Sequence, residues 1–160
     1  MEDYKIYSQA SANGMPDNIC SFLCAQARHE TGNYKHRFYT IGKNAFGYSY
    51  VKGAKWQLDK GGSNADNGVP IAQYASVENS VNEICDWIRR RQKEGKFTSN
   101  LANLTLQQYC KLLKDNGYYQ APLSEYTNAT LAHFNKLPAD LKKKHPVTSL
   151  ICPHCGKLVK

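Results

Sequence analysis

The stretch Ala25-Gln26-Ala27-Arg28-His29-Glu30-Thr31-Gly32 ends a predicted amphipathic helix over about residues 17–31. Pro16 and Asp17 suit the first turn of such a helix, and Gly32 suits the left-handed conformation just beyond its end. Glu30 continues the apolar stripe at spacings of three and four residues. That stripe consists of Ile19, Phe22, Leu23, Gln26 and Ala27. The Glu30 side chain is therefore predicted to face the core or a cleft.

A carboxyl group in this position is expected to hold its proton more tightly than usual. Partial desolvation disfavours the charged form, and the negative end of the helix dipole disfavours it again. A raised pKa is what a general acid needs near neutral pH. The alternative is an ordinary salt bridge from Glu30 to Arg28, His29 or a lysine elsewhere in the chain.

Four segments resemble family 73 glycoside hydrolases, the lysozyme-like N-acetylglucosaminidases of peptidoglycan. Residues 25–32 are similar to the Gln-Ala-x-x-Glu-(Thr/Ser)-Gly motif that closes the catalytic helix of that family. The others follow in family order: Asn44-Ala45-Phe46-Gly47-Tyr48, then Tyr74-Ala75-Ser76-Val77-Glu78-Asn79-Ser80-Val81, then Gly117-Tyr118-Tyr119 with Tyr126. The resemblance covers roughly residues 5–137. It implies that Glu30 is the catalytic proton donor.

The resemblance also implies an active-site tyrosine and aromatic contacts to the sugar. Tyr118-Tyr119-Gln120-Ala121-Pro122 departs from the Tyr-Ala-Thr-Asp pattern of the family, so Tyr118 and Tyr119 are both candidates. Tyr126 is expected to be a packing residue of the next helix. Aromatic rings between residues 34 and 56 suit stacking on sugars or on bases, and the candidate acid beside them favours sugars. The residues expected to bind substrate are Phe46, Tyr48, Trp56 and Tyr74.

The fold class expected from this resemblance is α+β and lysozyme-like, a mainly helical body with a small β-lobe inserted after the catalytic helix. Apolar periodicity and capping residues predict further helices over about 76–95, 105–116 and 124–137, and a short helix or extended piece near 4–10. Strand and turn chemistry between residues 40 and 74 predicts the lobe. We expect one domain over residues 1–137, followed by a basic tether and a cysteine knuckle over 138–160.

Glycoside hydrolysis normally uses a second carboxyl group as base or nucleophile. Asp59 is the preferred candidate, because it follows a probable strand in the β-lobe. Asp66 is expected at a loop tip, and Glu78 is already explained by its place in the first turn of a helix. Substrate-assisted cleavage and lytic transglycosylation need no second carboxylate, and both stay open.

The composition indicates one domain, and the positive net charge indicates that it binds an anionic polymer. The chain has 160 residues, is 41% hydrophobic and carries a formal net charge of +8. It contains no apolar run near the roughly twenty residues that span a bilayer. The charge by itself is compatible with binding to the bacterial cell wall or to a nucleic acid, but no nucleic-acid-binding module is recognisable in the sequence. The first thirty residues lack a signal peptide, so we expect a phage endolysin released through a holin or a virion-associated lysozyme.

The six cysteines fall into two groups. Cys20, Cys24, Cys85 and Cys110 lie within predicted helices and are expected to be buried free thiols. Cys152 and Cys155, in Cys152-Pro153-His154-Cys155, resemble one knuckle of a zinc ribbon. They provide half of a tetrahedral site, so a structural zinc would need a partner chain or His145 and His154. No cofactor is expected for catalysis, and the tail is expected to serve self-association or a virion partner.

The function expected from the sequence is a peptidoglycan hydrolase that cleaves β-1,4 glycosidic bonds, most simply an endo-β-N-acetylglucosaminidase. Muramidase or lytic transglycosylase chemistry on the same fold is the enzymatic alternative. A wall-binding or virion structural module without activity is the alternative from another class.

Overall fold

The computed structural model describes residues 2–64, 68–98 and 100–142. The α-helices are α1 (Glu2–Ala12), α2 (Asp17–Glu30), α3 (Arg37–Thr40), α4 (Val77–Lys93), α5 (Leu106–Asp115) and α6 (Leu123–Asn135). The other elements are the 3-10 helices η1 (Leu101–Asn103) and η2 (Ala139–Leu141) and the strands β1 (Gln57–Asn64) and β2 (Pro70–Tyr74). The expected α+β arrangement, a helical body with a small inserted β-lobe, is confirmed.

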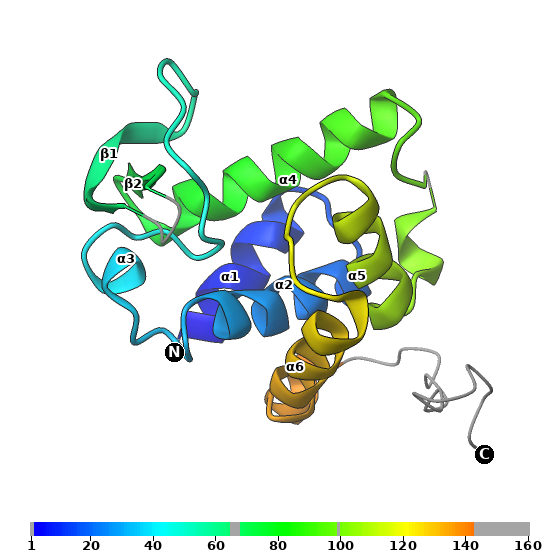
Figure 1. The fold of residues 1–160 in the computed structure, drawn as a ribbon. Coiled ribbons are helices and arrows are strands. Elements are labelled where there is room, and N and C mark those ends of the chain that lie inside the picture. Colours follow the sequence, from blue (N-terminus) through cyan, green and yellow to red (C-terminus); the bar gives the residue numbers. More distant parts are fainter. Residues whose placement is uncertain (1, 65–67, 99, 143–160) are drawn as a thin grey trace.

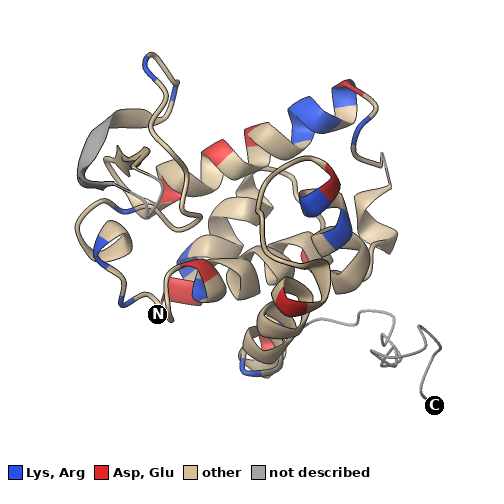
Figure 2. Cartoon of the chain, viewed as in Figure 1, with Lys and Arg blue, Asp and Glu red and all other residues tan. Residues whose placement is uncertain are grey.

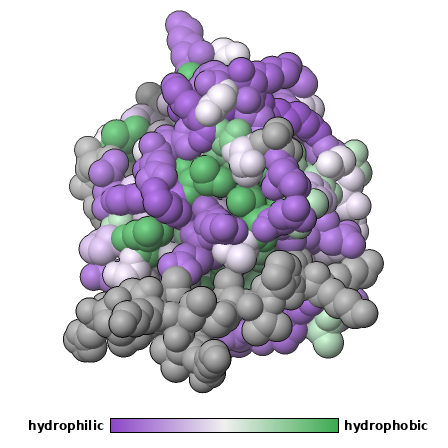
Figure 3. Space-filling view, turned by 90° about the vertical axis from the view of Figure 1, so that its right-hand side faces the viewer, coloured by the Kyte–Doolittle hydropathy of each residue, from purple (hydrophilic) through white to green (hydrophobic). Residues whose placement is uncertain are grey.

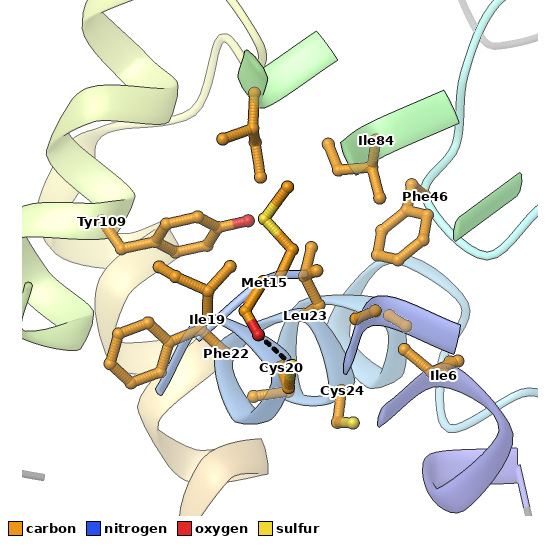
Figure 4. Close-up of a cluster of buried hydrophobic side chains, with 14 of the residues drawn as sticks. Ile6, Met15, Ile19, Cys20, Phe22, Leu23, Cys24, Phe46, Ile84 and Tyr109 are labelled. Atoms are coloured by element: carbon orange, nitrogen blue, oxygen red, sulfur yellow. Dashed lines mark hydrogen bonds between the residues drawn. The ribbon is translucent and has the colours of Figure 1, made fainter. Parts of the chain in front are cut away.

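Helix α2 lies at the centre of the body, between α1, α5 and α6, while the small sheet lies at the N-terminal end of α4 (Figure 1). Every residue of α2 from Asn18 to Ala27 is buried. Its apolar side chains pack with residues of α1, α4 and α5 in one hydrophobic cluster (Figure 4). Because α2 is surrounded along its length, its last turn has a fixed place at the surface of the body.

The ends of the main helices follow the local chemistry of the sequence. Ser76 caps α4 by accepting a hydrogen bond from the Asn79 backbone N–H, and Thr105 and Gln108 form the predicted capping box at the start of α5. Helix α2 ends at Glu30, and Gly32 has a φ of 55° beyond it. The segment near residues 4–10, expected to be either helical or extended, is helix α1.

The β-lobe is an antiparallel hairpin of β1 and β2. Gln57 pairs with Tyr74 and Asp59 pairs with Gln73, and an isolated bridge joins Ser49 to Ile71. Outside the hairpin, the strand chemistry expected between residues 40 and 74 therefore yields one isolated bridge at Ser49. Helix α3, which precedes the lobe, is a single turn that the sequence did not predict.

Two carboxylates of α4 hold the lobe against the helical body. Glu83 accepts hydrogen bonds from the Tyr74 hydroxyl at 2.5 Å and from Gln57 Nε2 at 2.8 Å. Asp86 accepts one from Trp56 Nε1 at 2.8 Å. These contacts bind the open end of the hairpin, where Gln57 pairs with Tyr74, to α4, so the lobe has a defined place beside the body.

The four helical cysteines are buried and free, as expected. Residues 138–142, expected to begin a tether, instead pack on the body. Leu141 is 4% exposed, and its carbonyl accepts a hydrogen bond from the Ser21 hydroxyl. The Cys152 and Cys155 knuckle lies outside the described residues, and within the described ranges no group of three or more metal-ligating side chains occurs. No described helix is long and apolar enough to cross a membrane.

Candidate active site

Glu30 is the last residue of α2, and its carboxyl group is only partly exposed. The Tyr126 hydroxyl, from α6, donates a hydrogen bond of 2.6 Å to Glu30 Oε1. Burial raises the pKa of the Glu30 carboxyl to about 7, and the hydrogen bond from Tyr126 acts in the opposite direction. The group is thus poised to be a proton donor near neutral pH.

The salt bridge considered as an alternative for Glu30 does not use its neighbours. Arg28 binds Asp3 instead, with Nε 2.8 Å from Oδ1 and Nη2 2.5 Å from Oδ2. The His29 ring packs edge-on against Tyr126, with centroids 4.8 Å apart. Arg28 and His29 therefore contact other residues, and the Glu30 carboxyl binds Tyr126 instead.

The second oxygen of Glu30 faces the turn that follows α3. A Cβ placed on Gly47 would lie 3.6 Å from Glu30 Oε2, so the Gly47 backbone borders this oxygen. Gly47 has a φ of 66°, a conformation that favours glycine. The buried side chain of Asn44 holds the turn, because its Oδ1 accepts from the backbone N–H groups of Phe46 and Tyr48.

The structure assigns the three candidate tyrosines different places. Tyr126, expected to pack, donates directly to the acid. Tyr119 stacks on the Tyr126 ring with centroids 3.7 Å apart, and its hydroxyl donates to the Cys110 carbonyl. Tyr118 donates to the Phe46 carbonyl at 2.6 Å. Tyr126 packs in the core as expected, at 4% exposure, and in addition its hydroxyl binds the acid, a contact that was not expected.

The four aromatic residues expected to bind substrate differ in exposure. Phe46 and Tyr74 are each 2% exposed, so their rings belong to the core and are not available to a sugar. Tyr48 and Trp56 are partly exposed. Trp56 binds Asp86 through its indole N–H, and Lys55 Nζ lies 4.2 Å from its ring centroid. Their contact with substrate stays a prediction.

The second carboxyl group is not fixed by these contacts. Asp59 lies in β1 opposite Gln73, as expected for a residue of the β-lobe, while its side chain and the whole of Asp66 lie outside the described part of the structure. Glu78 lies in the first turn of α4. Sequence reasoning missed Glu83 and Asp86 as the acids that meet the lobe, and only their place on the lobe-facing side of α4 reveals them.

Charge is distributed unevenly along α4. Its acids lie in the part beside the β-lobe, and its Lys and Arg gather at the far end (Figure 2).

On the face that Figure 3 shows, hydrophilic residues surround small apolar areas. Among the described residues, most large apolar side chains lie in the core, and Ile41, Val51, Leu58 and Val69 are exposed.

The sequence of the chain matches the model of a known protein family. The model of the glucosaminidase family, described as mannosyl-glycoprotein endo-β-N-acetylglucosaminidase, matches residues 6–138. The chain belongs to the glucosaminidase family. It is a glycoside hydrolase, as the resemblance implied. Among curated proteins none matches the chain in sequence.

Solved structures similar to this glucosaminidase share its lysozyme-like fold. A peptidoglycan hydrolase from Sphingomonas sp. A1 is 17% identical, with a TM-score of 0.59 over 86% of each chain. A glycoside hydrolase domain of FlgJ from Salmonella typhimurium is 14% identical, with a TM-score of 0.58 over 82% of this chain and 91% of that one. The catalytic domain of the autolysin Auto from Listeria monocytogenes is 17% identical, with a TM-score of 0.54 over 83% and 82%.

Proposed function

We propose that the chain is an endo-β-N-acetylglucosaminidase that cleaves β-1,4 bonds of bacterial peptidoglycan, with Glu30 as the general acid. The observation that carries this proposal is the Glu30 carboxyl, with a pKa raised to about 7, between the Tyr126 hydroxyl and the Gly47 backbone. Family membership supports the reaction. Fold neighbours named as peptidoglycan hydrolases support the substrate, and the net charge of +8 suits an anionic wall.

In this proposal the two carboxyl oxygens of Glu30 have different roles. Oε1 accepts the Tyr126 hydrogen bond, which leaves Oε2 to carry the transferable proton. Oε2 lies beside Gly47, where no side chain intervenes. A glycosidic oxygen approaching there receives the proton as its bond to the anomeric carbon breaks, and the leaving sugar departs as a neutral alcohol.

The mechanism also needs a second group, which activates water or attacks the anomeric carbon on the opposite side of the sugar. We propose Asp59, because it lies in strand β1 of the β-lobe. As a base, it would take a proton from the attacking water. Substrate assistance by the 2-acetamido oxygen, and attack by the 6-hydroxyl in a transglycosylase, leave the role of Glu30 unchanged.

Action at the cell wall is part of this proposal, because the polymer lies there. Delivery by a phage particle or release through a holin, and a virion or self-association partner for the C-terminal tail, complete the proposed biology. Immunoblots of purified virions and of lysates made with and without a holin test this part. Protein found only in cells that neither lyse nor release particles would contradict it.

Zymography on purified cell wall tests the activity, and mass spectrometry of the released fragments tests the bond. Reducing N-acetylglucosamine ends are expected. Reducing muramic acid ends would indicate a muramidase, and anhydro products would indicate a transglycosylase. Absence of any fragment from the folded protein, while a control hydrolase digests the same wall, would contradict the proposal.

A further inference from the structure

Asp3, in the first turn of α1, is a buried carboxylate that the proposed reaction does not use. It is 4% exposed, and the first turn of α1 lies beside the last turn of α2 (Figure 1). Arg28 of α2 binds both of its oxygens, with Nε 2.8 Å from Oδ1 and Nη2 2.5 Å from Oδ2. The Tyr34 hydroxyl donates a further hydrogen bond, of 2.6 Å, to Oδ1. One carboxylate therefore holds two residues that flank Glu30 in the chain, one before it and one after it.

The turn that follows Glu30 has an unusual backbone. Gly32, Asn33 and Tyr34 have φ angles of 55°, 57° and 67°, so three consecutive residues lie in the left-handed region. Glycine adopts this conformation freely and asparagine does so fairly often, whereas a residue as bulky as tyrosine seldom does. Such a conformation persists only where the surrounding contacts enforce it. The contacts of Tyr34 are therefore needed to keep the shape of this turn.

Tyr34 is held both from within the turn and from α1. Within the turn, its backbone N–H donates a hydrogen bond of 2.9 Å to the Thr31 hydroxyl. Its own hydroxyl binds Asp3, and its ring packs against the Tyr39 ring with centroids 5.1 Å apart. The Tyr39 hydroxyl in turn donates to Glu2, the neighbour of Asp3 in α1. These side-chain contacts join the left-handed turn to the first turn of α1.

Glu30 thus lies between two residues that are bound to the same carboxylate. Arg28 joins the last turn of α2 to Asp3, and Tyr34 joins the following turn to it. We infer that Asp3 is a positioning residue: by holding both flanking side chains, it fixes the place and the burial of the Glu30 carboxyl. This inference rests on the proposed function of Glu30.

The physical reason is that a general acid depends on where its carboxyl lies. A misplacement near 1 Å at a reacting group costs on the order of 10²-fold in rate. Burial also raises the pKa of Glu30, so a loosened last turn of α2 would admit water and lower that pKa. Loss of Asp3 is therefore expected to change both turnover and the proton affinity of the acid. Loss of an ion pair that only joins two helices would change stability alone.

The test compares Asp3→Ala with Asp17→Ala, in the full chain. Asp17 lies in the first turn of α2, at the opposite end from Glu30, and accepts a hydrogen bond of 2.8 Å from Tyr7 of α1. Both substitutions thus remove a carboxylate that joins α1 to α2 through a tyrosine hydroxyl. Asp3→Ala is expected to lower kcat about 10-fold with KM little changed, whereas Asp17→Ala lowers only the melting temperature. A folded Asp3→Ala protein with wild-type kcat would overturn the inference.

Tyr34→Phe removes a single hydroxyl and is the milder variant. It is expected to lower kcat in the same direction as Asp3→Ala and by less. In the double variant Asp3→Ala/Tyr34→Phe, the loss is expected to be no larger than in Asp3→Ala, because the first substitution already breaks the contact between the two residues. Losses that multiply would overturn the inference. If Asp3→Ala does not fold, Tyr34→Phe carries the test alone, and wild-type kcat in it would overturn the inference.

An NMR titration of the Glu30 carboxyl separates this inference from the proposed function, because it needs no activity. In Asp3→Ala and in Tyr34→Phe the pKa of Glu30 is expected to fall from about 7 toward 4.5, the ordinary value. In Asp17→Ala it is expected not to move. A wild type that lacks wall lysis would contradict the proposed function. An unchanged Glu30 titration in Asp3→Ala, or in Tyr34→Phe if Asp3→Ala does not fold, would contradict the positioning role.

Discussion

The Tyr126 hydroxyl donates a 2.6 Å hydrogen bond to Oε1 of Glu30, although the two residues lie 96 positions apart. This contact joins α6 to the end of α2 and binds one of the two carboxyl oxygens of the acid. It also opposes the rise in the pKa of Glu30 that burial causes. The pKa near 7 thus reflects burial, which raises it, and the hydrogen bond from Tyr126, which lowers it.

Glu30→Gln is expected to abolish wall lysis and leave the fold intact, because the amide keeps the shape of the side chain and cannot transfer the proton. The expected loss is at least about 10²- to 10⁴-fold. Turbidity of purified wall measures it. Glu125→Gln, at an exposed position of α6, is the matched control and should retain activity. A folded Glu30→Gln protein with near wild-type lysis would remove Glu30 from its role.

Tyr126→Phe is expected to reduce turnover about 10-fold and to move the high-pH limb of the rate profile upward. The reason is that the lost hydrogen bond favoured the charged form of Glu30, so its pKa rises. Tyr119→Phe, which loses a bond to the Cys110 carbonyl instead, serves as the comparison. Identical pH profiles for wild type and Tyr126→Phe would show that this contact does not tune the acid.

The pH dependence of lysis and of stability should share one cause. Activity is expected to fall as the pH rises through about 7, where Glu30 loses the proton it donates. The folded pKa lies above the ordinary value of 4.5, so between pH 4.5 and 7 the folded state binds more protons than the unfolded state. The contribution of Glu30 to the free energy of unfolding therefore falls as the pH rises through this window.

Glu30→Gln removes the pH-dependent contribution of Glu30 to the free energy of unfolding, so this variant tests the raised pKa without measuring activity. The variant is expected to melt at a higher temperature than the wild type at pH 8, with a smaller difference at pH 5. Thermal denaturation at both pH values measures it, and Glu125→Gln again serves as the control. An equal difference at the two pH values would mean that the carboxyl titrates normally in the folded protein.

Asp59→Asn is expected to reduce turnover more than Asp66→Asn or Glu78→Gln. Asp59 lies in β1 of the lobe, whereas Glu78 is stabilised in the first turn of α4 by the helix dipole. Initial rates on purified wall, with circular dichroism as the check on folding, compare the three variants. Equal and small effects would favour substrate assistance or a transglycosylase route.

Truncation from Pro146 onward is expected to leave the body folded and active. Truncation after Leu137 is expected to destabilise it, because η2 is lost and Leu141 leaves its buried place against α2. Melting temperature, zinc content and oligomeric state of the full chain and of both truncated chains measure these effects. Loss of lysis by the folded, longer truncation would give the tail a catalytic or substrate-docking role.

Features that depend on residues close together in the chain could be predicted from the sequence. Periodicity and end residues predicted α2 with Glu30 at its end, the capping box of α5 and the burial of the helical cysteines. Each of these follows from residues three or four positions apart, or from a single residue at a helix end. The family order of four motifs added the lysozyme-like fold.

Only the tertiary structure decided which groups meet at the acid. Phe46 was expected to face the sugar but lies in the core, and Tyr126, which packs as expected, also donates to Glu30. Helical periodicity predicts which face of a helix is buried, but not which residue of another element lies opposite. The partners of Glu30 come from α6 and from the turn after α3, so their contacts depend on how these distant segments pack around α2.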